Sequence, residues 1–403
     1  MKLGSWISIF GIYLFGVCGA STVSKIIPLS GDIGTSFGLA PANFGWLVSL
    51  IALPAALFAI PSGLVVDRLG ARLVLLLAAA GGVLANLIYY TAPSLGFIQL
   101  ARLLEGFAVV HVYTAGPAML MASTDGNKRT RAMTLWSTYA PVGTAIGLAM
   151  GGYFAEGDGW RNTFLLHGLL FAVAGALGFL QPKVAPVNLQ SVSIGQRLRD
   201  LGAAFLSPKL VLLTLAFFLL ISMGLGANVT FPTHLAAVHD ISVQASSNMV
   251  AGTTLAMVLG SLGVGLILPT GIRPPVLLTV IAACSFAAGA LCFYPEVSLG
   301  GRSVALFAWF VFTGACMAAM LAMLPMVAEA GRQGSAAALI NFAGAAATFL
   351  NPPLWLAISA TGEWTPFVGL MAIGWALAAI LVWASALMLY RSKAGTEGSP
   401  SAG

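Results

Sequence analysis

Residues 97–122 read FIQLARLLEGFAVVHVYTAGPAMLMA, an apolar run long enough to cross a lipid bilayer as one helix. Three ionisable residues, Arg102, Glu105 and His111, lie inside this run. A charge in the hydrocarbon core costs at least ~2.5–3.5 kcal/mol, so such a residue usually faces a cavity or a partner. The stretch therefore predicts a membrane-spanning helix whose polar side chains face a cavity or a partner.

The rest of the chain also has the composition of a membrane protein. Of its 403 residues, 59% are hydrophobic and 7% are charged, whereas soluble domains carry about 25% charged residues. The apolar runs last about 20 residues, not the ~10 of barrel strands, so we expect helices. Twelve runs are predicted to span the membrane, at 5–29, 42–66, 73–92, 97–122, 133–154, 160–180, 209–235, 243–268, 275–294, 302–328, 335–358 and 364–390.

The basic residues determine the predicted orientation. An even number of spans places both termini on one side of the membrane. All basic residues except Lys25, Arg102, Arg161 and Arg302 fall in the loops and tails of that side. Because cytoplasmic loops carry the excess of Lys and Arg, both termini are expected in the cytoplasm, with the chain in the plasma (bacterial inner) membrane. The net charge of +6 then reflects topology, and no nucleic-acid partner is expected.

The sequence repeats itself weakly at about half its length. GLVVDRLGARLVL at 63–75 is echoed by GLILPTGIRPPVL at 265–277. Parallel repeats occur in secondary transporters, whose substrate site lies between the halves near the bilayer midplane. The predicted domains are a six-helix bundle at 1–182, a cytoplasmic linker with a short amphipathic helix at 183–208, a second six-helix bundle at 209–390 and a disordered cytoplasmic tail at 391–403.

The segment GLVVDRLGARL resembles the signature loop of the major facilitator superfamily. The matching residues are Gly63, Asp67, Arg68, Gly70 and Arg72. In that family the loop forms a charge latch on the cytoplasmic side, so the same gating role is expected here. The resemblance implies an all-α integral membrane protein with twelve transmembrane helices in two pseudo-symmetric six-helix bundles.

Two further segments are similar to motifs of the same family. Arg102 followed by Gly106 resembles the fourth-span motif, with Glu105 at the usual polar position. GTAIGLAMGG at 143–152 resembles the glycine-rich fifth-span motif of proton-driven exporters, but Leu148 stands where that motif has proline. A multidrug/proton antiporter therefore stays open as an alternative function.

Lys25 and Arg102 are predicted to lie ~6 Å and ~8 Å from the outer ends of their spans, with Glu105 one turn deeper than Arg102. Helices one, four, seven and ten line the central cavity of the resembling fold, so these residues are expected to form one cluster. In one interpretation the two cations reach the outer headgroups and Glu105 neutralises one of them. In the other they line the pathway, where the spare positive charge favours a carboxylate-type substrate and Glu105 exchanges the proton.

Four further residues are predicted to bind substrate. Tyr113 lies eleven positions after Arg102 and so returns to the same helix face. His111 lies nine positions after Arg102 and is expected to pack against neighbouring helices instead. The second half offers polarity without charge, and its predicted binding residues are Asn228, Thr230 and Asn341.

These features predict a proton-coupled secondary transporter that moves a small organic anion by alternating access. The alternatives are the multidrug antiporter and a non-transporting sensor or scaffold. The sequence has no P-loop, catalytic triad or metal-ligand spacing, so we expect no enzyme activity, no cofactor and no metal. The expected partners are the lipid bilayer, the solute and protons, and the chain is expected to be a monomer.

Overall fold

The structure is a computed structural model that describes residues 1–183, 195, 199, 202–203, 205–224, 226–328 and 333–397. Every regular element within these ranges is a helix, which confirms the predicted all-α class. Most of the linker predicted at 183–208, with its amphipathic helix, lies outside the described residues.

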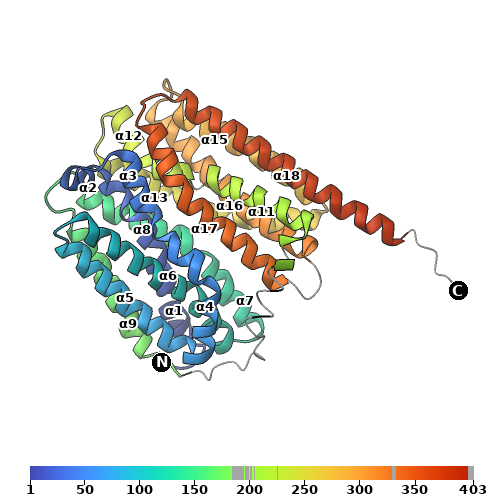
Figure 1. Cartoon of the computed structure of the whole chain (residues 1–403), viewed down its shortest axis with the longest axis horizontal. Helices are drawn as coiled ribbons and strands as arrows, with labels where there is room; N and C mark the ends of the chain where they lie inside the picture. Colours follow the sequence, from blue (N-terminus) through green and yellow to red (C-terminus); the bar gives the residue numbers. More distant parts are fainter. Residues whose placement is uncertain are drawn as a thin grey trace. The chain divides into compact units, whose positions relative to one another are not determined.

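Figure 1 colours the helices in chain order, from blue at the N-terminus to red at the C-terminus. The first half contains α1 (Trp6–Ser24), η1 (Ile27–Leu29), α2 (Ser30–Phe37), α3 (Pro41–Ser49), α4 (Ala52–Leu69), α5 (Ala71–Thr91), α6 (Leu95–Ser123), α7 (Gly126–Ser137), α8 (Tyr139–Phe154) and α9 (Asn162–Phe179). The second half contains α11 (Pro208–Gly224), η2 (Gly226–Val229), α12 (Phe231–His239), α13 (Val243–Thr254), α14 (Met257–Ile267), η3 (Leu268–Thr270), α15 (Pro274–Phe293), α16 (Leu299–Val327), α17 (Gln333–Ser359) and α18 (Thr365–Glu397).

These helices correspond to the twelve predicted spans. Among the described residues, 10 helical stretches are long and apolar enough to cross a membrane. The other two predicted spans correspond to α8, which has only 16 residues, and to α17, whose apolar character is diluted by Asn341 and Asn351. The last span continues further than predicted, because α18 runs to Glu397 and includes residues 391–397 of the predicted tail.

Prolines explain why several predicted spans are built from two helices. Proline has no N–H group, so the carbonyl four residues earlier loses its helical hydrogen bond. Three helices end at or next to such a carbonyl: Ser24 before Pro28, Leu50 before Pro54, and Ser137 before Pro141. The carbonyl groups in the last turn of a helix lack the usual helical donors, and within a membrane they need others.

The chain forms two compact units whose boundaries differ from the predicted domains. Unit 1 contains Met1–Gln190, Val229–Leu255 and Phe349–Thr361, and unit 2 contains Ser191–Asn228, Ala256–Thr348 and Gly362–Gly403. In unit 1, α5 packs against α6 and α9, and α8 packs against both α1 and α13. In unit 2, α11 packs against α18, and α16 packs against α14 and α15.

Glycines allow the closest of these helix contacts. A Cβ added at Gly147 of α8 would collide with Ser24 and with the Ser21 carbonyl of α1, and one added at Gly151 would collide with the Lys25 carbonyl. Small residues that bring backbones together are the usual basis of helix packing in membranes. The glycine-rich segment of α8 therefore holds that helix directly against the end of α1.

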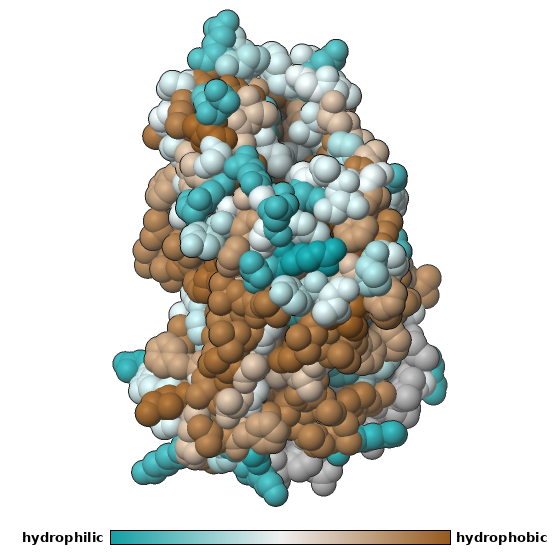
Figure 2. Space-filling view, turned by 90° about the vertical axis from the view of Figure 1, so that its left-hand side faces the viewer, coloured by the Kyte–Doolittle hydropathy of each residue, from teal (hydrophilic) through white to brown (hydrophobic). Residues whose placement is uncertain are grey.

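The surface is suited to a lipid environment. Large apolar side chains such as Leu77, Leu169 and Ile373 are more than half exposed. Figure 2 shows broad apolar areas on the face that it presents, with polar residues gathered in separate patches. Apolar areas of this extent are unusual on soluble monomers and are expected where acyl chains replace water.

Candidate functional site

The structure brings Lys25, Arg102 and Glu105 together, as the sequence predicts. The Lys25 Nζ atom lies 2.5 Å from Glu105 Oε1, and Arg102 Nη1 lies 3.4 Å from Glu105 Oε2. All three side chains are buried inside unit 1, with at most 1% exposure. Full burial excludes the interpretation in which the two cations reach the outer headgroups.

Arg102 donates to carbonyl groups in the last turns of α1 and α3. Its guanidinium lies 2.7 Å from the Thr22 oxygen and 3.3 Å from the Val23 oxygen, both near the C-terminus of α1. It also lies 3.0 Å from the Val48 oxygen near the C-terminus of α3. A helix C-terminus carries about half a negative charge, so two such ends stabilise this cation in addition to Glu105.

Three side chains that the sequence analysis did not select complete the cluster. Asn86 and Tyr89 belong to α5, and His167 belongs to α9. Asn86 Oδ1 accepts a hydrogen bond from Lys25 at 2.5 Å, and the Tyr89 hydroxyl donates to Glu105 Oε2 at 3.0 Å. His167 Nδ1 lies 2.7 Å from Lys25 Nζ. We refer to these six residues, Lys25, Asn86, Tyr89, Arg102, Glu105 and His167, as the buried cluster.

The hydrogen bonds of Lys25 assign the tautomer of His167. A lysine ammonium has three N–H donors, and here three acceptors surround it: Asn86 Oδ1, Glu105 Oε1 and His167 Nδ1. If Nδ1 accepts, the proton of the neutral imidazole is on Nε2, which lies 2.9 Å from the Ser21 hydroxyl. Every donor of the ammonium group is then satisfied by protein.

The predicted site residue Tyr113 lies outside the buried cluster. Its ring packs against Gly19 of α1, and its centroid is 4.9 Å from that of Tyr139 in α8. His111, on the opposite face, has Nδ1 2.8 Å from the Phe107 carbonyl of its own helix and contacts the Phe107 ring. His111 therefore occupies a packing position.

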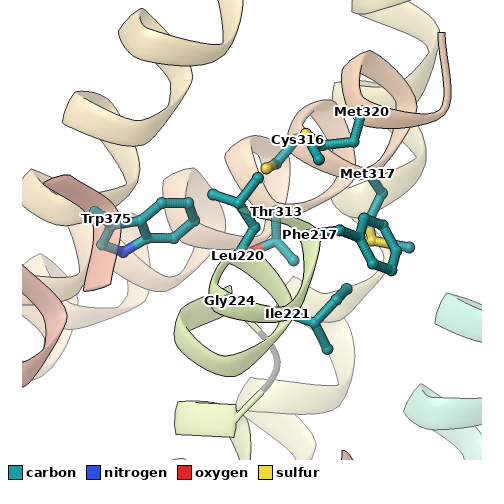
Figure 3. Close-up of a pocket in the computed structure, with 9 residues that line it drawn as sticks. All are labelled: Phe217, Leu220, Ile221, Gly224, Thr313, Cys316, Met317, Met320 and Trp375. Carbon is teal, nitrogen blue, oxygen red and sulfur yellow. The ribbon is translucent and has the colours of Figure 1, made fainter. Parts of the chain in front are cut away.

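The predicted residues of the second half lie at separate places. Asn228 accepts a hydrogen bond from Trp309 Nε1 at 3.0 Å within unit 2. Thr230 is fully buried just before α12, and Asn341 is exposed on α17. Unit 2 also holds a small apolar cavity between α11, α16 and α18, shown in Figure 3. Its lining residues are Phe217, Leu220, Ile221, Gly224, Thr313, Cys316, Met317, Met320 and Trp375.

The predicted gating loop joins α4 to α5. Gly70 has a φ of 81°, a backbone conformation that glycine adopts readily, and it forms the turn between the two helices. Arg72 donates to the Gly178 and Phe179 carbonyls at 3.2 and 2.6 Å and so caps the C-terminus of α9. Gly63, Asp67 and Arg68 belong to α4, ahead of the turn.

Curated relatives of this chain are transporters and resistance proteins. The chain is 26% identical over 137 residues to the multidrug resistance protein Stp of Mycobacterium tuberculosis, a match that covers 34% of this chain and 26% of Stp. It is also 26% identical over 249 residues to the uncharacterized MFS-type transporter YceJ of Bacillus subtilis, covering 61% of this chain and 62% of YceJ. The matches therefore span less than two thirds of these relatives.

The fold and the family are supported over a larger part of the chain. A crystal structure of a bacterial homolog of the human lysosomal transporter Spinster, inward-facing and unoccupied, superposes with a TM-score of 0.74 at 17% identity, covering 98% of both chains. The model of the Major Facilitator Superfamily matches residues 6–352. This chain is a member of the major facilitator superfamily, a family of multi-pass membrane transporters, and it has the twelve-helix fold of that family.

Proposed function

We propose that this transporter couples the movement of a small organic anion to that of a proton, with the buried cluster as the coupling site. The observation that supports this proposal is the pairing of two cations with a single carboxylate, all fully buried. When Glu105 is ionised, its negative charge neutralises Lys25. The charge of Arg102 is stabilised by carbonyl groups at the C-termini of α1 and α3.

A proton on Glu105 would change this balance. The protonated carboxyl group no longer neutralises Lys25, so the cluster gains one positive charge in a site without water access. An unpaired buried charge is unfavourable by several kcal/mol, and a substrate carboxylate would offset it. Arg102 Nε offers a further donor, because it is buried and has no hydrogen-bond partner among the described residues. Proton and anion would therefore bind together.

A transport assay with Glu105→Gln tests the proposal. Gln mimics the protonated carboxyl group, so the variant should exchange labelled benzoate across proteoliposome membranes but fail to accumulate it in response to a pH gradient. Asp240→Asn is the matched control, because Asp240 is an exposed acid at the end of α12. Accumulation that persists in Glu105→Gln, or that is lost equally in Asp240→Asn, would contradict the proposal.

A multidrug/proton antiporter is the second candidate. It is favoured by the glycine contacts of α8 against α1, by the resemblance of that segment to the exporter motif, and by the relative Stp. In that case a proton on Glu105 would repel a cationic drug, and a lipophilic cation such as ethidium would leave as protons enter. Ethidium flux that survives Lys25→Met, without benzoate flux, would favour the antiporter. Ligand binding without any flux would indicate the sensor or scaffold.

We also propose that the chain acts as a monomer in the bacterial inner membrane with both termini in the cytoplasm. The distribution of basic residues supports this orientation, and the bacterial relative YceJ supports the location. The proposed gating role of Gly63, Asp67, Arg68, Gly70 and Arg72 depends on the same orientation.

A further inference from the structure

Unit 1 contains two neighbouring cavities that are separate from the buried cluster. Their volumes are about 330 Å³ and about 260 Å³, and Leu39 lines both of them. The larger cavity lies beside α2, α3 and α12, whose labels stand close together in Figure 1. Small-molecule sites typically occupy about 300–1,000 Å³, so the pair together has the size of one ligand site.

The larger cavity, here called the hydroxyl chamber, is lined by the alcohols of Ser30, Thr35, Thr233 and Ser359. Thr35 donates its proton to the Gly31 carbonyl at 2.9 Å, and Thr233 donates to the Thr230 carbonyl at 3.2 Å. Each oxygen therefore keeps its acceptor capacity for a ligand that donates. The residues that line the chamber include no charged side chain, so an ion would gain no counter-charge there.

Gly31 is the lining residue chosen for substitution, because it has no side chain of its own. A Cβ added at Gly31 would meet no atom within 4 Å, although Gly31 belongs to α2 and lines the chamber. Because Gly31 lines the chamber, we expect a larger residue at this position to narrow it.

The smaller cavity, here called the apolar groove, is lined mainly by Trp46, Leu47, Leu50, Leu95 and Phe349. The rings of Trp46 and Phe349 lie 5.5 Å apart. Two amides, Asn43 and Gln99, complete the lining. The groove is formed along α3 and at the start of α6. The predicted topology places the start of both helices at the outer face of the bilayer, where tryptophan is common.

We propose that the two cavities form one site for a single-chain amphiphile with an uncharged, hydroxyl-bearing head, such as a monoacylglycerol. The head would donate to Thr35 and Thr233 in the hydroxyl chamber, and the acyl chain would lie in the apolar groove beside Trp46. Burial of the acyl chain in the apolar groove supplies the affinity. The hydroxyl oxygens of the chamber select a head group that donates hydrogen bonds. The proposal does not depend on the charge of the transported solute or on the buried cluster.

The site joins segments that are far apart in the sequence. α2 and α3, the start of α6, α12 and the end of α17 all contribute lining residues. A ligand that contacts all of them stabilises the arrangement in which they are packed together. Occupancy of the site would therefore oppose any step of the transport cycle that separates these segments.

Tryptophan fluorescence tests the site directly. The full chain is placed in phosphatidylcholine nanodiscs, and 1-decanoylglycerol with a brominated chain is added, because bromine quenches tryptophan on contact. We expect saturable quenching that is largely lost in Trp46→Phe. Gly31→Leu should weaken the apparent affinity by about tenfold, since a leucine in the lining is expected to narrow the chamber, and Thr233→Val should weaken it as well.

Matched controls separate specific binding from partitioning into the bilayer. Gly252→Leu should leave the affinity unchanged, because Gly252 is a helical glycine of α13 whose added Cβ also meets nothing within 4 Å. Brominated decanoate and brominated decyltrimethylammonium have the same ten-carbon chain but a charged head group in place of glycerol. They should bind about tenfold more weakly than brominated 1-decanoylglycerol. Equal quenching by all three heads, or equal affinity in Gly31→Leu and Gly252→Leu, would overturn the proposal.

Discussion

At the scale of single residues, the two cations of the buried cluster have different supports. Arg102 is stabilised by Glu105 and also by carbonyl groups of α1 and α3. Lys25, in contrast, has Glu105 as its paired acid. Removal of one partner from a buried ion pair leaves an uncompensated charge, which costs about 3–5 kcal/mol. The cost should therefore depend strongly on which member is removed.

Lys25→Met should lower the thermal unfolding midpoint much less than Glu105→Gln. The first change leaves Arg102 paired with Glu105, while the second leaves two buried cations without a carboxylate. The double variant Lys25→Met/Glu105→Gln should regain part of the midpoint lost in Glu105→Gln. Midpoints of purified protein measure this order, and an equal loss in both single variants would contradict it.

An anionic substrate should stabilise Glu105→Gln more than it stabilises the unchanged chain. The variant has an uncompensated cation that a carboxylate can neutralise, so binding recovers part of the lost stability. The measurement is the shift in unfolding midpoint with added benzoate. A smaller shift in Glu105→Gln than in the unchanged chain would argue against an anion site at the cluster.

The charged members of this cluster could be predicted from sequence, but its neutral members could not. Lys25, Arg102 and Glu105 are conspicuous because charge is rare in apolar spans. Asn86, Tyr89 and His167 lie on α5 and α9, and their relation to Lys25 depends on helix rotation and packing. The spacing of Asn86 and Tyr89, three positions apart on one helix face, was the available signal.

At the scale of elements, the glycines of α8 determine how closely that helix approaches α1. An alanine at position 147 would collide with Ser24 and with the backbone of Ser21. Gly147→Ala should therefore destabilise the protein by about 1–3 kcal/mol, as overpacking does. Gly81→Ala in α5 is the matched control, because its Cβ would meet Ala108 at an ordinary 3.7 Å.

Thermal unfolding separates the two glycine variants. Gly81→Ala should be neutral or stabilising by about 0.5–1 kcal/mol, since alanine favours a helix. If Gly147→Ala unfolds at the same temperature as Gly81→Ala, then α8 can move away from α1 at no cost and the close contact is not required.

The number and order of spans could be predicted from hydropathy. The positions at which a helix ends within a span could not. Pro28, Pro54 and Pro141 interrupt helices, whereas Pro61 and Pro117 lie inside α4 and α6 without ending them. A helix end inside the membrane needs donors for its last carbonyl groups, and Arg102 supplies them for α1 and α3. These donors come from other helices, so the local sequence does not reveal them.

At the scale of the whole molecule, segments of the second half pack on the first-half helices within unit 1. Gly45 of α3 faces the backbone of Pro352 and Pro353, and Gly152 of α8 faces Ser247 of α13. A Cβ at either glycine would be closer than 3.0 Å to these atoms. Backbone atoms cannot yield as a flexible side chain can, so the first contact requires glycine at position 45.

Gly45→Leu should therefore separate the end of α17 from α3 and expose the hydroxyl chamber. Alternating access requires contacts between the two halves to form and break, so a variant that prevents one contact shifts the population toward the state without it. The measurement is the rate at which a membrane-impermeant maleimide labels Ser359→Cys in a cysteine-free background. We expect labelling about tenfold faster with Gly45→Leu and unchanged with Gly263→Leu, whose added Cβ meets nothing within 4 Å. Because Ser359 lines the chamber beside α3, an unchanged rate in Gly45→Leu would mean that this contact does not control access to the outer face.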